Sequence, residues 1–221
     1  PMDSLATVIK DRGWANLSIG VEMDNYWFSA AAFLSMQTYL TEARFVDATG
    51  LVNWQRAVKS TQELEYMRIA GRIVGAMHKR ILEKAEPGIR KCDLVAEIWD
   101  VGTRGVDGYG GDYPAIVPLL PSGPAAAAPH LTWDGEPFRK GEGTTFEIAG
   151  CYRRYHAPFC RTMFLGTPPD EMLRAADALA AGLEAGLDAA RAGNRCRDIA
   201  DAMNGELAKV GIIRAARCGY P

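Results

Sequence analysis

The chain has 221 residues, of which 48% are hydrophobic and 24% charged, and 25 Lys and Arg nearly balance 27 Asp and Glu to give a net charge of −2. These values are typical of a folded globular protein and disfavour disordered, collagen-like and coiled-coil structures. A nearly neutral chain also lacks the basic surface that binds nucleic acid or an anionic membrane, so we expect neither partner.

The longest stretch without a charged residue, 113–133, contains five prolines and therefore predicts a loop system rather than a membrane helix. The first residues lack the basic and apolar regions of a secretory signal peptide. The five cysteines are odd in number and form no CxxC pair, which favours a reducing compartment with most of them buried. We therefore expect a cytoplasmic protein.

Residues 1–58 alternate between helical and extended patterns, which is typical of a small α/β unit. Two strands form only a marginal sheet by themselves, so the pattern predicts the C-terminal part of a larger α/β domain. The expected helices span residues 4–12 and 29–42, and the expected strands span residues 17–21 and 44–46.

A second domain is predicted over residues 59–221. Ser60 and Glu63 form a capping box that begins a long helix, and a second helix is expected over 93–103, after Gly88. Strands are expected between residues 143 and 165. The apolar positions of the long helix recur every three or four residues, at Leu64, Met67, Ala70, Val74, Met77 and Ile81.

The long-helix, glycine, short-helix pattern occurs twice. Gly88 and Asp93 have counterparts 105 positions later in Gly193 and Asp198, which suggests an internal duplication. The second long helix has its own apolar stripe at Leu173, Ala176, Leu179, Leu183 and Leu187. No strands follow the second helix pair before residue 221, so we expect a fragment truncated at its C-terminus, and at its N-terminus as well.

Two side chains are the main catalytic candidates. His130 closes a loop of small residues that allows a ligand to approach the backbone closely. Glu147 is expected on a strand, facing away from Phe146 and Ile148, and a carboxylate in a central strand is costly unless it is paired or functional. A solvated loop histidine and a glutamate on a solvated sheet face remain the simpler alternatives.

Three residues of the following strand are candidates for binding substrate. Arg161 is expected to pair with Glu147 or to clamp a substrate carboxylate. Tyr155 and His156 lie in the same basic, aromatic hairpin. The sequence contains no HExxH, GxSxG, P-loop or GxGxxG motif and no zinc-type spacing of Cys and His, so we expect neither a metal nor another cofactor.

Four features together resemble the creatinase and aminopeptidase P family, whose catalytic domain has the pita-bread fold. They are the Arg56-x-x-Lys59-Ser60-x-x-Glu63 segment, the loop over 122–130, the hairpin over 147–162 and the repeated helix pairs. The resemblance implies an α+β pita-bread fold, truncated before its C-terminal sheet and preceded by the end of the small α/β domain. Within the family, residues 18–33, 113–133 and 146–166 are most similar to ectoine hydrolases.

The hairpin departs from the pattern of the family's metallopeptidases. Those enzymes place two aspartates eleven residues apart, at positions that correspond to Glu147 and Pro158 of this chain. Because proline has no side-chain donor, a bridging two-metal site cannot form there. The resemblance therefore favours the metal-free branch, which includes creatinase and ectoine hydrolase.

The resemblance implies a metal-independent hydrolase acting on a non-peptide C–N bond, which opens the cyclic amidine of ectoine to an N-acetyl-2,4-diaminobutyrate. A carboxylate attracts the cationic amidinium, whereas a metal dication repels it. We expect Glu147 to act as nucleophile or general base and His130 to deliver a proton to the departing nitrogen. The family also implies a homodimer, and further catalytic residues beyond residue 221 that leave this fragment inactive.

Three alternatives stay open at this point. One is a metallopeptidase similar to Xaa-Pro aminopeptidase, and another is a creatinase-type amidine hydrolase. The third is a non-catalytic module that keeps the pita-bread fold and uses its pocket for binding. Retention of both His130 and Glu147 disfavours this last alternative, because a binding module needs neither a base nor a proton carrier.

Overall fold

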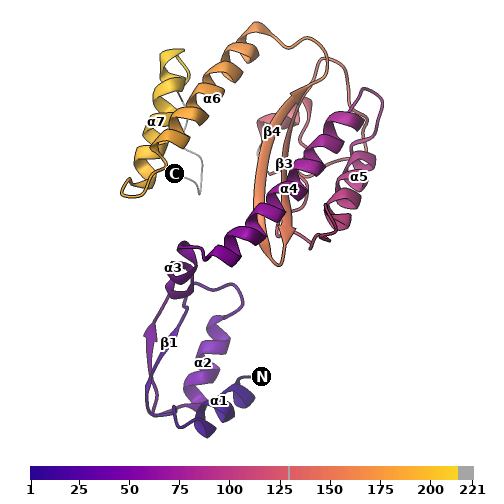
Figure 1. Ribbon diagram of the computed structural model, residues 1–221. Coiled ribbons are helices and arrows are strands. Elements are labelled where there is room, and N and C mark those ends of the chain that lie inside the picture. The colour runs from indigo at the N-terminus through magenta and orange to yellow at the C-terminus, as the bar shows by residue number, and fades with distance from the viewer. Residues whose placement is uncertain (129, 214–221) are drawn as a thin grey trace. The chain divides into compact units, whose positions relative to one another are not determined.

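The computed structural model describes residues 1–128 and 130–213, and the chain divides into two compact units, residues 1–65 and the residues from Tyr66 onward (Figure 1). This division falls inside the helix α4 (Thr61–Lys84). The boundary predicted from the sequence, at residue 58, precedes that helix and stays a prediction.

The first unit pairs two short parallel strands. Because parallel strands need a crossover connection, a helix is required between them, and α2 provides it, capped by the Ser29 side chain. A small core forms from Ala6, Met36 and Leu40. The elements are α1 (Met2–Asp11), β1 (Ser18–Val21), α2 (Ala30–Tyr39), β2 (Arg44–Asp47) and α3 (Leu51–Ala57), of which the sequence analysis missed only α3.

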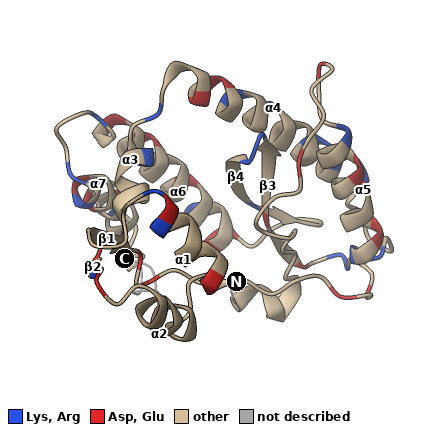
Figure 2. Ribbon diagram, turned by 90° about the horizontal axis from the view of Figure 1, so that it is seen from below, with Lys and Arg blue, Asp and Glu red and all other residues tan. Residues whose placement is uncertain are grey.

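The second unit begins with two helices, α4 and α5 (Lys91–Arg104). The predicted capping box is confirmed, because the Ser60 amide donates to Glu63 Oε2 at 2.7 Å and the Glu63 amide donates to Ser60 Oγ at 3.3 Å. Arg80 on α4 donates to the carboxylate of Glu97 on α5. Both helices carry charges of both signs along their outer faces (Figure 2).

A long antiparallel hairpin follows, formed by β3 (Gly143–Tyr152) and β4 (Tyr155–Phe164). Its two-residue turn has positive φ at both positions, 51° at Arg153 and 65° at Arg154, as a type I′ turn requires. Residues other than Asn and Gly are strained in this backbone conformation. The guanidinium of Arg154 lies over the ring of Tyr113, with its carbon 4.1 Å from the ring centroid, and this contact offsets part of the strain.

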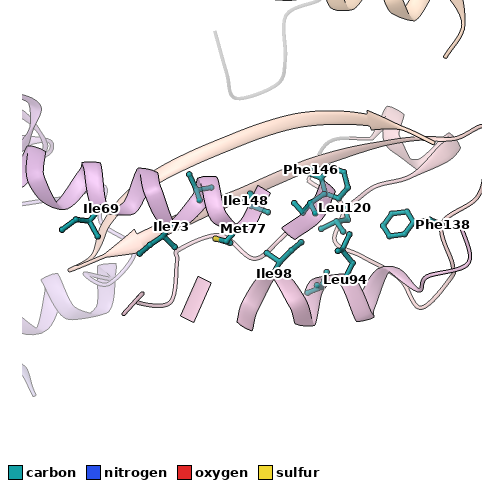
Figure 3. Close-up of a cluster of buried hydrophobic side chains, with 12 residues drawn as sticks. Ile69, Ile73, Met77, Leu94, Ile98, Leu120, Phe138, Phe146 and Ile148 are labelled. Carbon is teal, nitrogen blue, oxygen red and sulfur yellow. The ribbon is translucent and has the colours of Figure 1, made fainter. Parts of the chain in front are cut away.

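One face of the hairpin packs on α4 and α5 (Figure 3). Successive strand residues point to opposite faces, so the burial of Phe146 and Ile148 in this core directs Glu147 to the other face. The buried residues of the cluster are Ile69, Ile73, Val74, Met77, Ile81, Leu94, Val95, Ile98, Leu120, Phe138, Phe146 and Ile148.

The free edge of β3 is covered by residues 119–122. Leu119 and Glu147 exchange backbone hydrogen bonds of 2.9 and 3.1 Å, and the Thr145 amide donates to the Pro121 carbonyl at 3.1 Å. The 3₁₀ helix η1 (Gly123–Ala127) follows directly. Glu147 therefore occupies a strand held on both edges, which fixes its backbone.

The second helix pair repeats the first. Helices α5 and α7 (Cys196–Lys209) both have 14 residues, and their bounds differ by 105 positions at each end (91 to 196 and 104 to 209). The preceding glycines, Gly88 and Gly193, have φ of 97° and 95°. The predicted repeat of helix, glycine and short helix is thus confirmed in the structure.

The long helix of the second pair, α6 (Asp170–Ala189), buries its small residues rather than its leucines. Ala178, Gly182 and Gly186 are buried, and the two glycines lie against Met203 of α7. The leucines of the predicted stripe, namely Leu173, Leu179, Leu183 and Leu187, are about half exposed in the described part of the chain.

The cysteines are less buried than predicted. Among the four that lie within the described residues, only Cys151 is buried. Cys92 is half-buried, while Cys160 and Cys196 lie on strand and helix positions that face solvent. The expectation that most cysteines are buried is therefore wrong for these four, and Cys218 lies outside the described residues.

Among residues 1–128 and 130–213, which the structure describes, no helix combines the length and apolar character needed to span a membrane.

Candidate active site

The two predicted catalytic residues lie next to each other. His130 Nε2 is 3.8 Å from Glu147 Oε2, and both side chains are partly exposed, at 42% and 35%. This separation is too long for a direct hydrogen bond but short enough for strong attraction whenever the imidazole is protonated. The structure thus brings together a carboxylate from the middle of β3 and an imidazole from the loop after η1.

Both side chains open into one cavity of about 340 Å³. This volume lies at the small end of the range for small-molecule sites. Its lining combines apolar side chains with one carboxylate, one imidazole, one hydroxyl and one thiol. The cavity is lined by Leu119, Pro121, Ala126, Ala127, Ala128, His130, Thr145, Glu147 and Cys160.

The loop that carries His130 has an unusual backbone. His130 has φ of 62°, a left-handed conformation that is uncommon for residues other than glycine. At the start of the loop, Gly123 has φ of 58°, and a Cβ there would lie 2.8 Å from the carboxylate carbon of Glu142. Another residue at position 123 would be strained by this φ, and the Glu142 side chain would have to move to make room for it.

The structure does not bring Arg161 to the cavity. Arg161 is paired with Phe146 across the hairpin, and directly opposed residues point to the same face, so Arg161 lies on the face opposite Glu147. Its guanidinium carbon is 4.0 Å from the ring centroid of Phe159, and it donates to the Cys160 carbonyl. The predicted pair between Arg161 and Glu147 is therefore wrong.

The opposite face of the hairpin holds a histidine that the sequence analysis did not select. The ring centroids of His78, on α4, and Phe159 are 4.7 Å apart. Burial lowers the pKa of His78, and the nearby positive charge of Arg161 lowers it further. Its surroundings therefore disfavour the protonated form of His78.

Tyr155 and His156 support the hairpin and its neighbouring loop. The Tyr155 ring packs 5.5 Å from that of Tyr66, at the turn end of the hairpin. His156 Nε2 accepts the Ala115 amide at 2.9 Å, and its Nδ1 lies 3.1 Å from the Arg154 carbonyl. With both ring nitrogens occupied by the backbone, His156 holds the loop at Ala115 rather than lining the cavity.

The donors of the hairpin do not fit a two-metal site. Pro158 is paired with Ala149 and so shares the face of Glu147, and its side chain offers no ligand atom. In the part of the chain that the structure describes, no group of three or more His, Cys, Asp and Glu has the arrangement to hold a metal ion.

Two cavity residues, Thr145 and Cys160, were missed by the sequence analysis. The strand register places Cys160 directly opposite Glu147, and Thr145 is two residues away on the same face. A signal for both was present, because counting outward from a two-residue turn at Arg153 and Arg154 pairs Glu147 with Cys160.

A long hairpin backed by two helices, a repeated helix pair and a carboxylate beside an imidazole define a protein of the pita-bread fold. Solved structures of this fold superpose on nearly the whole chain. An Xaa-Pro dipeptidase from Bacillus anthracis matches with a TM-score of 0.81 and 20% identity over 95% of this chain and 57% of its own. The prolidase from Pyrococcus furiosus gives 0.81 and 16% over 96% and 59%.

The sequence is matched over residues 65–220 by the model of metallopeptidase family M24, and the chain belongs to this family. It is 58% identical to the ectoine hydrolase of Halomonas elongata, over 100% of this chain and 57% of that protein. An uncharacterized hydrolase/peptidase of Sinorhizobium fredii is 36% identical over 92% of this chain and 52% of its own length. The chain thus spans about half the length of these relatives.

Proposed function

We propose that this chain belongs to a metal-independent hydrolase that opens the cyclic amidine ring of ectoine to an N-acetyl-2,4-diaminobutyrate. The observation that carries the proposal is the placement of Glu147 and His130, 3.8 Å apart, in one small cavity. The identity of 58% with an ectoine hydrolase supports the choice of substrate.

The chemistry follows from the charge of the substrate. The amidinium carbon is electrophilic and cationic, so the Glu147 carboxylate attracts it. In the nucleophilic form of the mechanism, a Glu147 oxygen bonds to this carbon and one ring C–N bond breaks. Water then adds to the same carbon and the carboxylate leaves. In the general-base form, Glu147 takes a proton from the attacking water instead.

His130 has the position to complete either form. The departing ring nitrogen must gain a proton as its bond to carbon breaks, and the imidazole lies beside the carboxylate that faces the same carbon. Overall one water is consumed, one C–N bond is broken, and the amidine carbon becomes the carbonyl of an acetamide. No step needs a metal ion or another cofactor.

The apolar side chains that line the cavity suit the rest of the substrate. The amidine carbon carries a methyl group, and Leu119 together with the alanines 126–128 provides a surface of small apolar side chains. A site that combines a carboxylate with small apolar side chains fits a compact cation with an apolar substituent.

The test is Glu147→Gln in the full-length gene product, with ectoine ring opening followed by proton NMR after treatment with a chelator. We expect turnover to fall by at least about 1,000-fold, because the amide neither attacks carbon nor accepts a proton. Glu136→Gln, which changes an exposed carboxylate outside the cavity, is the matched control and should retain full activity. Retained turnover in Glu147→Gln would exclude Glu147 from the mechanism.

A metallopeptidase is the second candidate, because the chain belongs to family M24 and has the fold of prolidases. The same preparation distinguishes the two. Ectoine opening in the presence of chelator supports the metal-independent hydrolase, whereas hydrolysis of an Xaa-Pro peptide only after Mn²⁺ is added supports the peptidase. Creatine, tested in parallel, distinguishes a creatinase-type enzyme.

The proposal includes a cytoplasmic homodimer. Sedimentation of the full-length protein at several concentrations measures the oligomeric state. A species of twice the chain mass supports the dimer, and a monomer at all concentrations contradicts it.

A further inference from the structure

The loop that carries His130 is tied to the fold by a polar pair at each end. We define the His130 loop as residues 122–128 and 130–134, the part of this loop that the structure describes. Its first tie is a hydrogen bond of 2.8 Å between the hydroxyls of Ser122 and Thr144. Both residues are buried, and Thr144 lies on β3, three residues before Glu147.

The second tie joins the other end of the loop to α5. Lys91 Nζ donates to both carboxylate oxygens of Asp134, at 2.9 and 3.0 Å. The Lys91 amide also donates to the Glu136 carbonyl at 3.1 Å. Asp134 comes four residues after His130, and Lys91 holds its pKa below the usual range for a carboxyl group.

Lys91 stands where a lysine is unfavourable. It is the first residue of α5, and the partial positive charge of a helix N-terminus repels an ammonium group. Its side chain is also buried, with 8% exposure, and burying a charge costs free energy even when the charge is paired. The ion pair with Asp134 offsets part of this cost.

We propose that Lys91 is a positioning residue, which holds His130 beside Glu147 by fixing the end of the His130 loop through Asp134. This inference rests on the proposed function, and it extends that function to a residue outside the cavity. His130 has an uncommon left-handed backbone, and its imidazole lies 3.8 Å from the Glu147 carboxylate, so a displacement of the loop changes the distance between these two groups.

The chain offers a matched control on the same helical turn. Arg90 also forms an ion pair, with Asp93 at 2.6 Å, but both partners are exposed and the pair stays within the first turn of α5. Lys91→Met and Arg90→Met therefore each remove one cation from the start of α5, and only the first loosens the loop.

The experiment compares these variants in the full-length protein, with ectoine as substrate. We expect Lys91→Met to lower kcat by about 10- to 100-fold with little change in KM, because misplacing a catalytic group by about 1 Å has an effect of this size. Asp134→Ala removes the same tie from its exposed side and should give the same result if Lys91→Met folds poorly. Arg90→Met should leave both constants unchanged.

A double-mutant cycle separates positioning from a general loss of structure. If Lys91 acts through His130, then Lys91→Met has no further effect on kcat once His130 is replaced by Ala. Loss of kcat by the same factor in both backgrounds would overturn the proposal.

Hydrogen exchange at the amides of residues 125–128 and 130–133 gives a readout that does not depend on activity. Faster exchange in Lys91→Met, and not in Arg90→Met, supports the tie, and unchanged exchange overturns it. If His130→Ala leaves kcat unchanged while exchange in Lys91→Met still rises, then the proposed role of His130 in the reaction is wrong. Lys91 then holds the loop, but the loop does not contribute to catalysis.

Discussion

Glu147 owes its position to the residues on either side of it in the chain. Phe146 and Ile148 bury their side chains between the hairpin and the helices, so the alternation of a strand directs the carboxylate to the opposite face. Hydrogen bonds to Leu119 hold the same backbone from the free edge of β3. The result is a rigidly placed carboxylate that remains partly exposed to a small cavity.

The lowered pKa of His78 predicts that the stability of the protein depends on pH. Its pKa is lowered in the folded protein, whereas in the unfolded chain it has its ordinary value of about 6.5. Above this value both states are neutral. As the pH falls below it, the unfolded chain binds a proton more readily, so the free energy of unfolding decreases until the pH reaches the lowered pKa of the folded state.

The measurement is the melting temperature at about pH 7.5 and about pH 5. We expect the difference between the two to be smaller in His78→Gln than in the unaltered protein. Arg161→Gln should also reduce it, by a smaller amount, because burial is the larger cause of the shift. An identical difference in all three proteins would contradict the assignment to His78.

Some of these residues were predictable and others were not. The period of two around Phe146 was sufficient to place Glu147 on the open face, and the small residues before His130 indicated a ligand-accessible loop. The same period, counted across the turn, assigns Arg161 to the other face. Lys91 was not predictable, because its role depends on a contact with Asp134, 43 positions away.

At the scale of elements, the packing of α4 on β3 depends on Gly150. A Cβ at this position would lie 2.2 Å from the Ala70 carbonyl oxygen and 2.7 Å from the Val74 amide nitrogen. Both are backbone atoms of α4, which cannot rotate away. The hairpin and the helix therefore approach more closely than any side chain at position 150 would allow.

We predict that Gly150→Ala destabilises the protein by about 1–3 kcal/mol, since the helix must move away from the strand. The control is Gly75→Ala on the exposed side of the same helix, where a Cβ meets no atom within 4 Å. This change should stabilise by about 0.5–1 kcal/mol, because alanine is the better helix former. Chemical denaturation measures both, and a stable Gly150→Ala would show that the contact is looser than described.

The order of elements was largely predictable because the local signals agreed with the final packing. The capping box at Ser60 and the glycine stops at Gly88 and Gly193 placed the helices within a few residues. Helix α3 was missed because it is only seven residues long and has no side-chain cap. Ile69 and Ile73 were missed as core residues, since the face of α4 that is buried depends on where the hairpin lies.

At the scale of the whole chain, the repeat at an offset of 105 relates two long helices in different surroundings. Val74 of α4 and Leu179 of α6 occupy equivalent positions. Val74 is buried, with 5% exposure, beside Gly150 of β3, whereas Leu179 is 53% exposed among the described residues. The same helical pattern therefore contributes to a core in the first copy and to an apolar surface in the second.

This difference gives a prediction for the 221-residue chain. Val74→Ala should lower the free energy of unfolding by about 2 kcal/mol, because it removes buried methyl groups and leaves a cavity. Leu179→Ala should change it by less than about 1 kcal/mol, since half of its side chain already contacts solvent. The exposed leucines should also bind a hydrophobic dye, and Leu179→Glu combined with Leu183→Glu should reduce this binding without lowering the melting temperature. Equal destabilisation by Val74→Ala and Leu179→Ala would mean that both copies of the repeat are covered in solution.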